Sequence, residues 1–119
     1  MILRLVLAVL VLVAPAYAQQ QATEATGAQL RVIDRLSGDV YDVIIPSPGV
    51  AEVERINITL NSCRYPVGNP ASDAFASLAV TDAQSGDMLF SGWMVASSPA
   101  LSAMDHPRYD IWVMRCTTS

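Results

Sequence analysis

The chain has 119 residues, which is enough for one small domain. It holds seven Lys plus Arg residues, all of them arginine, against eleven Asp plus Glu residues, and its formal net charge is −4. An acidic chain without lysine argues against a nucleic-acid partner, because that binding needs clustered cations. One His and two Cys exclude the usual zinc sites, which need three or four such ligands. We therefore expect no metal and no cofactor.

Residues 1–18 have the three parts of a secretory signal peptide. Residues 1–4 carry one positive charge, residues 5–13 are an unbroken apolar stretch, and Ala16 and Ala18 supply the small side chains that signal peptidase requires. The apolar stretch is far shorter than the about 20 residues of a bilayer-spanning helix. We expect cleavage between Ala18 and Gln19, export to the periplasm and no transmembrane span after processing. An uncleaved N-terminal anchor is the alternative.

Two cysteines, Cys63 and Cys116, follow the signal peptide. Disulfides form and persist in exported proteins, and two cysteines allow one intramolecular pairing. Closing a loop of this length should stabilise the domain by about 4 kcal/mol in the chain-entropy account. A redox-active pair is the alternative, but the wide separation favours a structural bridge.

The remainder of the chain alternates between strand and turn patterns. Residues 19–27 are small and polar without periodicity, which predicts a flexible leader. The clearest alternation places Ile56, Ile58 and Leu60 on one face of a strand. Similar patterns, separated by Gly, Pro and Asp-rich turns, predict strands at residues 28–36, 40–45, 55–61, 74–81, 88–96 and 109–116.

About six or seven strands joined by hairpins predict an all-β domain over residues 28–119, built as a small antiparallel sandwich or barrel. Residues 100–104 can form at most one short helical turn. The cysteines lie just past the third predicted strand and at the end of the last one. A disulfide between them requires these strand ends to approach within roughly 4.4–6.8 Å, Cα to Cα.

The C-terminal third has a distinctive sequence, with Phe-Ser-Gly-Trp-Met from Phe90, Ala-Ser-Ser-Pro-Ala-Leu-Ser from Ala96, His-Pro-Arg-Tyr-Asp-Ile-Trp from His106, and Cys116. This sequence resembles the C-terminal signature of an uncharacterised family of small exported alphaproteobacterial proteins, catalogued as a domain of unknown function. The resemblance implies export, a β-rich fold and a disulfide, and it brings no established activity. The family's gene context, near an accessory subunit of respiratory complex I, implies a partner on the envelope side of the inner membrane. This chain departs from the family in having a shorter loop between its first cysteine and residue 74.

This segment supplies the candidate interaction residues, which are Trp93, Ser97, Ser98, Pro99, His106, Pro107, Tyr109 and Trp112. If exposed, the two tryptophans and the tyrosine would anchor a partner. Their apolar surroundings favour a place in the core.

His106 is the only histidine, and it lies near Ser97 and Ser98, which are ingredients of a nucleophilic triad. No nucleophile-elbow motif fixes such a geometry. The other interpretation is that the serines cap a helical turn and that His106 hydrogen-bonds to the backbone near a bend. A metal site from His106, Asp105 and Asp110 would lack further ligands.

Acidic side chains are dispersed around the first predicted hairpin and its exit, and they fit a solvated face or a guarded sheet edge: Asp34, Asp39, Asp42, Glu52 and Glu54. Taken together, the sequence favours a periplasmic, non-enzymatic structural or interaction module of the cell envelope, with another envelope or inner-membrane protein as its partner. One alternative is an accessory protein of an inner-membrane respiratory complex. The other is a small hydrolase or ligand-binding module that uses His106 with Ser97 or Ser98.

Overall fold

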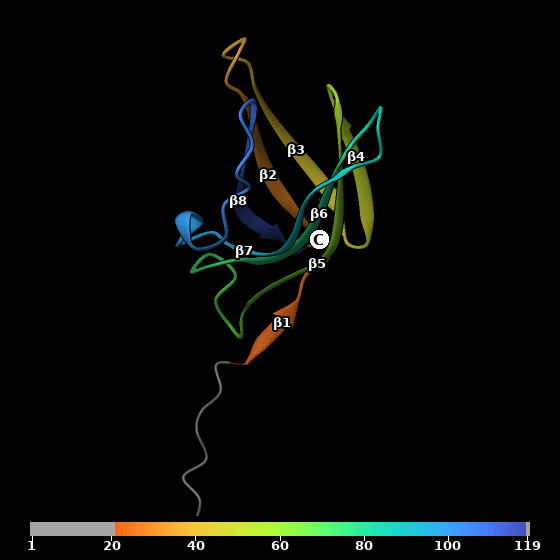
Figure 1. Cartoon of the computed structure of the whole chain (residues 1–119). Helices are drawn as coiled ribbons and strands as arrows, with labels where there is room; N and C mark the ends of the chain where they lie inside the picture. Colours follow the sequence, from red (N-terminus) through yellow and green to blue (C-terminus); the bar gives the residue numbers. More distant parts are fainter. Residues whose placement is uncertain (1–20, 119) are drawn as a thin grey trace, which may run out of the picture.

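The computed structural model describes residues 21–118, which form a two-layered β domain (Figure 1). The predicted signal peptide and its cleavage site at Ala18 and Gln19 lie outside these residues. Within them there is no helix long and apolar enough to cross a membrane. The strands are β1 (Ala22–Glu24), β2 (Gly27–Asp34), β3 (Val40–Pro46), β4 (Gly49–Val53), β5 (Ile56–Pro66), β6 (Phe75–Asp82), β7 (Met88–Val95) and β8 (Tyr109–Thr117).

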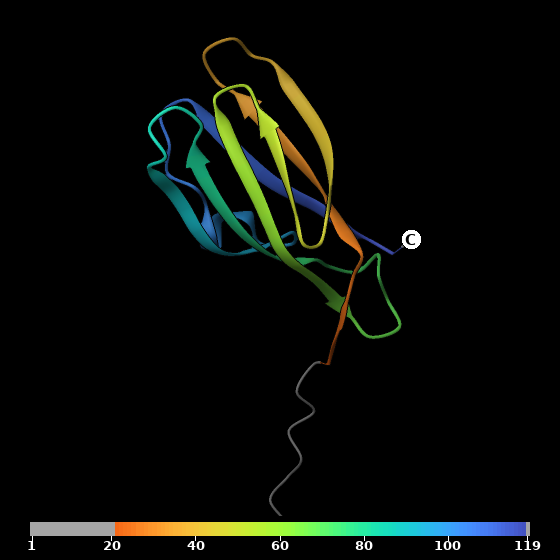
Figure 2. The ribbon, with the colours of Figure 1, turned by 90° about the vertical axis from the view of Figure 1, so that its right-hand side faces the viewer.

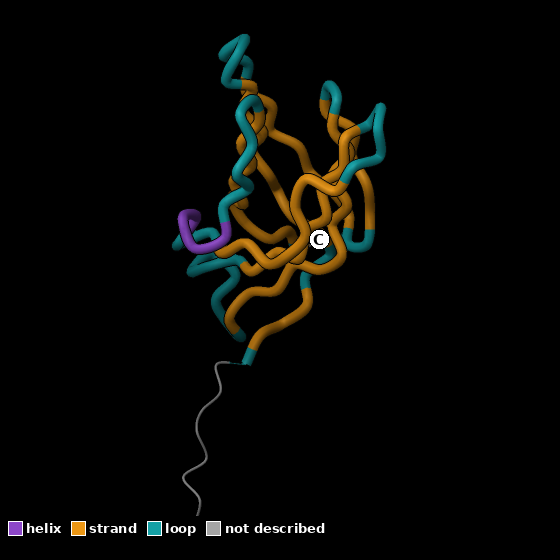
Figure 3. The backbone as a smooth tube through the Cα atoms, viewed as in Figure 1, coloured by secondary structure: helices purple, strands orange, loops and turns teal. Residues whose placement is uncertain are grey.

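The strands form two antiparallel sheets, which confirms the predicted all-β class. The larger, five-stranded sheet has the order β1-β5-β6-β7, with β4 also paired to β5, and the three-stranded sheet has the order β3-β2-β8. One 3₁₀ turn, η1 (Pro99–Ser102), follows β7, and it is the helical segment of the described chain (Figure 3).

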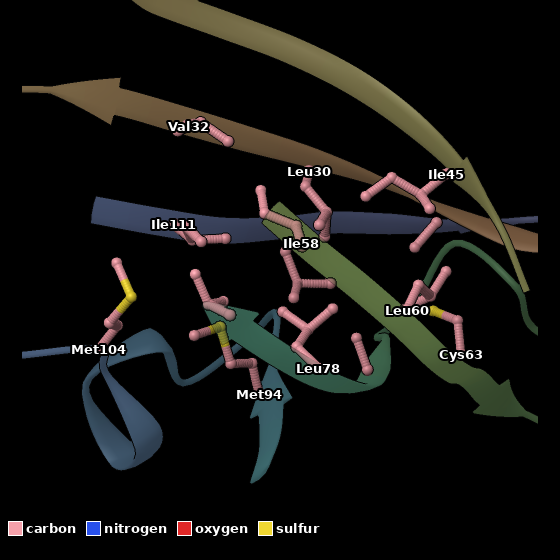
Figure 4. Packing of buried hydrophobic residues seen from close by; sticks show 14 of the residues in the cluster. Leu30, Val32, Ile45, Ile58, Leu60, Cys63, Leu78, Met94, Met104 and Ile111 are labelled. Atoms are coloured by element: carbon pink, nitrogen blue, oxygen red, sulfur yellow. The ribbon is translucent and has the colours of Figure 1, made fainter. Parts of the chain in front are cut away.

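The core lies between the two sheets. Ile56, Ile58 and Leu60 on β5 are fully buried, as their alternation predicts. Ile58 and Leu60 lie on the side of β5 that faces Leu30 on β2 (Figure 4). Fully burying an aliphatic side chain contributes about 1.5–3 kcal/mol relative to exposure. A domain of this size therefore depends on both sheets contributing an apolar face.

The predicted flexible leader is wrong for its described part. Residues 22–24 form β1, which pairs with the end of β5, and Gly27 already belongs to β2. Glu24 accepts hydrogen bonds from Ser62 Oγ at 2.6 Å and Arg64 Nε at 2.9 Å. A three-residue strand shows no periodicity, so its partners on β5 were needed to identify it.

The strands differ from the prediction in two further ways: β4 is an additional strand, and β5 is longer than expected. The sequence did not reveal β4, which follows the cis Ser47–Pro48 bond and pairs with β5 through Gly49↔Leu60 to Val53↔Ile56. β5 also continues to Pro66, past a register shift between Leu60 and Ser62. Cys63 therefore lies inside this strand and not beyond its end.

Two hairpin turns have the same sequence pattern, Asp-X-X-Ser-Gly-Asp, at residues 34–39 and 82–87. In the first, Asp34 Oδ1 accepts the N–H groups of Leu36 and Ser37. In the second, Asp82 Oδ1 accepts those of Gln84 and Ser85 in the same way. Each turn then uses a glycine with positive φ, at +81° and +76°. Both turns lie at one end of the domain (Figure 1).

The predicted disulfide is confirmed and ties the two sheets together near the other end. Cys63 on β5 and Cys116 on β8 are bonded with a Cα–Cα distance of 5.8 Å and a sequence separation of 53. Both side chains are buried in the core. The bridge therefore joins the central strand of one sheet to an edge strand of the other.

Replacing both cysteines, as Cys63→Ala with Cys116→Ala, should lower the free energy of unfolding by about 4 kcal/mol, because the unfolded chain loses a loop constraint. Urea denaturation of the oxidised wild type and the double variant measures this difference. The reduced wild type is the matched control and should behave like the double variant. A loss below ~1 kcal/mol would show that the bridge is not a main source of stability.

Candidate functional site

A groove of about 400 Å³ lies between η1, the segment that follows it, and β8. We call it the Trp112 groove, and it is lined by Arg35, Pro99, Ala100, Ala103, Met104, Asp105, Asp110 and Trp112. Met104 is 2% exposed and belongs to the same apolar cluster as Met94 and Ile111 (Figure 4). This buried methionine anchors the wall of the groove to the core.

Trp112 is 43% exposed, and its indole is held by neighbouring side chains. The indole Nε1 donates a hydrogen bond to Asp110 Oδ2 at 2.9 Å. The same carboxylate oxygen lies 3.4 Å from the guanidinium of Arg35. An aromatic side chain that is both exposed and fixed in orientation loses little conformational freedom when a partner packs on it.

Asp110 and His106 also accept hydrogen bonds from N–H groups on the free edge of β8. Arg35 N–H bonds to Arg108 C=O on the side facing β2, so the antiparallel alternation directs the N–H groups of Tyr109 and Ile111 away from β2. These two amides bond instead to His106 Nδ1 at 3.1 Å and to Asp110 Oδ1 at 3.0 Å. The first half of this edge therefore has no free N–H group for pairing with another strand, which favours contact through side chains.

His106 hydrogen-bonds to the backbone. Its Nδ1 accepts the N–H groups of Arg108 and Tyr109, and its C=O accepts a bond from Arg35 Nη1 at 3.1 Å. This matches the interpretation of His106 as a bend residue. Its ring also packs against that of Tyr109, with centroids 5.5 Å apart.

The two serines do not converge on His106. Ser97 donates through Oγ to Asp73 Oδ2 at 2.7 Å and through N–H to Asp73 Oδ1 at 3.0 Å. Ser98 is the N-cap residue of η1, and Pro99 is the first residue of that turn, but the Ser98 side chain makes no capping hydrogen bond. Among the hydrogen bonds of residues 21–118, none joins His106 to either serine. Within the same range, no group of three or more His, Cys, Asp or Glu side chains is arranged to hold a metal ion.

The aromatic residues of the segment separate into two classes. Tyr109 is 3% exposed, whereas Trp93 is 46% exposed, and Pro107 also lies at the surface. The expectation that both tryptophans belong to the core is wrong. Trp112 alternates with the buried residues Ile111 and Val113 and so points outward, while Trp93 points outward from β7 under the Arg64 guanidinium at 5.8 Å.

A polar cluster that the sequence patterns do not predict supports the groove. Asp34, expected on a solvated face, is fully buried, and its Oδ2 lies 3.0 Å from Arg108 Nη2. Arg108 also lies 3.7 Å from Glu54, which accepts a hydrogen bond from Tyr41 at 2.9 Å. Asp34 lies at alternate positions of β2 with Leu30 and Val32, so its side chain points to the same buried face of the strand. This alternation could have predicted its burial.

The cluster shifts the ionisation of its members. The hydrogen bond from the Arg108 guanidinium holds the pKa of Asp34 well below its usual range. The hydrogen bond to Glu54 raises the pKa of Tyr41 to about 12. Asp34 is therefore ionised at neutral pH, and Arg108 is held at the start of β8, next to the wall of the groove.

Asp34→Asn should destabilise the protein at pH 7 more than Asp82→Asn, because both aspartates accept the same turn hydrogen bonds but only Asp34 is fully buried against an arginine. A carboxylate with a lowered pKa adds stability above its unfolded pKa of about 3.9, and this is lost as pH falls through the folded pKa. The difference between wild type and Asp34→Asn should therefore be full at pH 7 and shrink below about pH 4.

Unfolding free energies measured from pH 7 to acid conditions test this dependence, with Asp82→Asn as the matched control. A wild-type advantage over Asp34→Asn that is constant with pH would contradict the assignment.

Comparison with known proteins finds one relationship. Neither the curated proteins nor the solved structures contain a match to this chain. The family described as "Uncharacterized protein conserved in bacteria (DUF2155)" matches residues 28–116, from the start of the core on β2 to the second cysteine. The match covers most of the chain and the whole of the Trp112 groove, and so the chain belongs to the DUF2155 family of conserved bacterial proteins.

Proposed function

We propose that this protein is exported to the periplasm and acts as a non-enzymatic interaction module of the cell envelope, binding another envelope or inner-membrane protein through the Trp112 groove. The observation that carries the proposal is the indole of Trp112, half-exposed beside a groove and fixed by Asp110. Exposed tryptophans that border a concave surface are typical anchors of protein interfaces. The predicted signal peptide and the disulfide support the periplasmic location.

The charges around the groove define the partner chemistry. Arg35 is paired with Asp110, whereas Asp105 is exposed on the wall of the groove. One cation and two carboxylates leave a net negative rim beside an aromatic surface. A partner segment with an arginine or lysine next to an apolar side chain would satisfy both features. An accessory role on an inner-membrane respiratory complex is one case of this proposal.

The hydrogen bonds of Ser97 and His106 support a structural role for these two residues, which a hydrolase would need for catalysis. The Ser97 hydroxyl donates to Asp73, and His106 Nδ1 accepts two backbone N–H groups. Using His106 Nδ1 as a general base would remove an acceptor that holds the start of β8. We therefore assign Ser97 to anchoring the segment between β7 and η1, and His106 to the support of the groove.

Site-specific photocrosslinking in intact cells tests the proposal. A photoreactive residue at Ala100, in the wall of the groove, should capture one identified envelope or inner-membrane protein. The same residue at the exposed Val50, in the other sheet, should not. Osmotic shock should release the uncaptured protein with its N-terminus at Gln19. Trp112→Ala should weaken binding by about 30-fold, as expected for a central aromatic anchor.

Trp93→Ala is the matched control, because Trp93 has a similar exposure but lies on β7. It should leave the crosslink unchanged, and both variants should keep the disulfide and the circular-dichroism spectrum of the wild type. Retention of the protein in the cytoplasm, or a crosslink at Ala100 that survives Trp112→Ala, would overturn the proposal.

A further inference from the structure

β7 is an edge strand whose outer side has no strand partner in the described chain. It is the last strand of the five-stranded sheet and pairs with β6 alone (Figure 2). Ala96 N–H bonds to Ala74 C=O, and the register continues through Ala76↔Met94 to Leu78↔Gly92. Antiparallel alternation therefore points the N–H and C=O groups of Ser91 and Trp93 away from β6.

The strand lacks the charged side chains and prolines that usually protect a free edge, and its one irregularity is the register shift at Leu89, near its start. Its eight residues, MLFSGWMV, include no charged side chain and no proline, and Met88 and Trp93 are exposed. The other long edge strands differ. On β8 side chains occupy two of the edge amides, and β3 carries Asp42 and Pro46. Sheet edges without charge or proline pair readily with other strands.

We propose that β7 pairs antiparallel with β7 of a second copy of this chain, about a two-fold axis at Ser91. Ser91 then lies opposite Ser91 of the second copy. Because the N–H and C=O groups of Ser91 and Trp93 point outward, this pair is a hydrogen-bonded pair. The register then places Phe90 opposite Gly92 and Leu89 opposite Trp93 of the other copy. The two sheets become one continuous sheet across the dimer.

The side chains of β7 are self-complementary in this register. A small residue lies at the axis, and each large residue meets a smaller one: Phe90 meets glycine, and Trp93 meets leucine. Within each copy the Phe90 ring lies beside Gly92 of its own strand, 3.4 Å from where a Cβ atom of residue 92 would stand, and the glycine brings no side chain of its own to the facing strand. The β6–β7 register shift falls on Leu89, which is the last residue of the paired stretch.

Electrostatic repulsion does not oppose the pairing of the two β7 strands. The chain has a net charge of −4, but no charged side chain lies on β7, so the facing strands bring no like charges together. This inference is independent of the proposed function, because it uses the edge of β7, whereas the Trp112 groove lies on β8.

Analytical ultracentrifugation of the purified, oxidised protein over micromolar to millimolar concentrations tests the dimer. Ser91→Pro removes an N–H that makes no hydrogen bond within residues 21–118, so the fold should survive on this edge strand while the dimer loses two hydrogen bonds. It should raise the dimer dissociation constant at least tenfold, about 1.4 kcal/mol. Trp93→Lys should do the same by placing charge at the contact.

Trp112→Lys is the matched control, because it changes the same residue type at nearly the same exposure on β8. It should leave dimerisation unchanged. A wild type that stays monomeric throughout, or a dimer that Trp112→Lys weakens as much as Trp93→Lys does, would overturn the inference.

Crosslinking tests the register separately. Facing residues of a hydrogen-bonded antiparallel pair have Cα atoms about 5.5 Å apart, which is within disulfide range. Ser91→Cys should therefore form an interchain disulfide under mild oxidation, whereas Ser85→Cys, in the turn before β7, should not. Equal crosslinking by both variants would contradict the two-fold axis at Ser91.

Discussion

No part of Asp34 reaches solvent, so its negative charge must be neutralised inside the domain. The neutralising group is Arg108, which stands immediately before β8 and whose N–H bonds to His106. Burying one carboxylate therefore fixes where the segment after η1 must end and where β8 must start. The Trp112 groove is a consequence, because its wall is this segment and its floor is the first half of β8.

The two sheets are joined near opposite ends by unlike interactions. Cys116 pairs with Ala28 near the start of β2 and carries the disulfide to β5, whereas Tyr109 pairs with Asp34 at the end of β2 beside the polar cluster. Glu54, in the β4–β5 turn, brings the larger sheet into that cluster. The apolar core fills the space between. A small domain with limited buried area gains from both a covalent and an ionic connection.

The sequence predicted the features that depend on a repeating hydrophobic pattern or on the number of cysteines. Strict alternation identified β5 and its buried face, and two cysteines in a chain with a predicted export signal identified the bridge. β1 and β4 were not predicted, because they are short and are defined by their pairing with β5. The burial of Asp34 and the exposure of Trp112 both follow from strand parity, but residue type suggested the reverse. Hydrogen bonds such as that of Ser97 to Asp73 depend on tertiary contacts that no local pattern contains.

The Asp34–Arg108 pair holds the start of β8 and thereby the groove. Amide hydrogen exchange in the wild type and in Asp34→Asn at neutral pH measures this support. Exchange at Arg108, Tyr109 and Ile111 should become faster by at least about tenfold in the variant, while the amides of the central strand β5 should be affected far less. Unchanged exchange at these three amides, or an equal increase throughout both sheets, would show that the pair does not hold this segment.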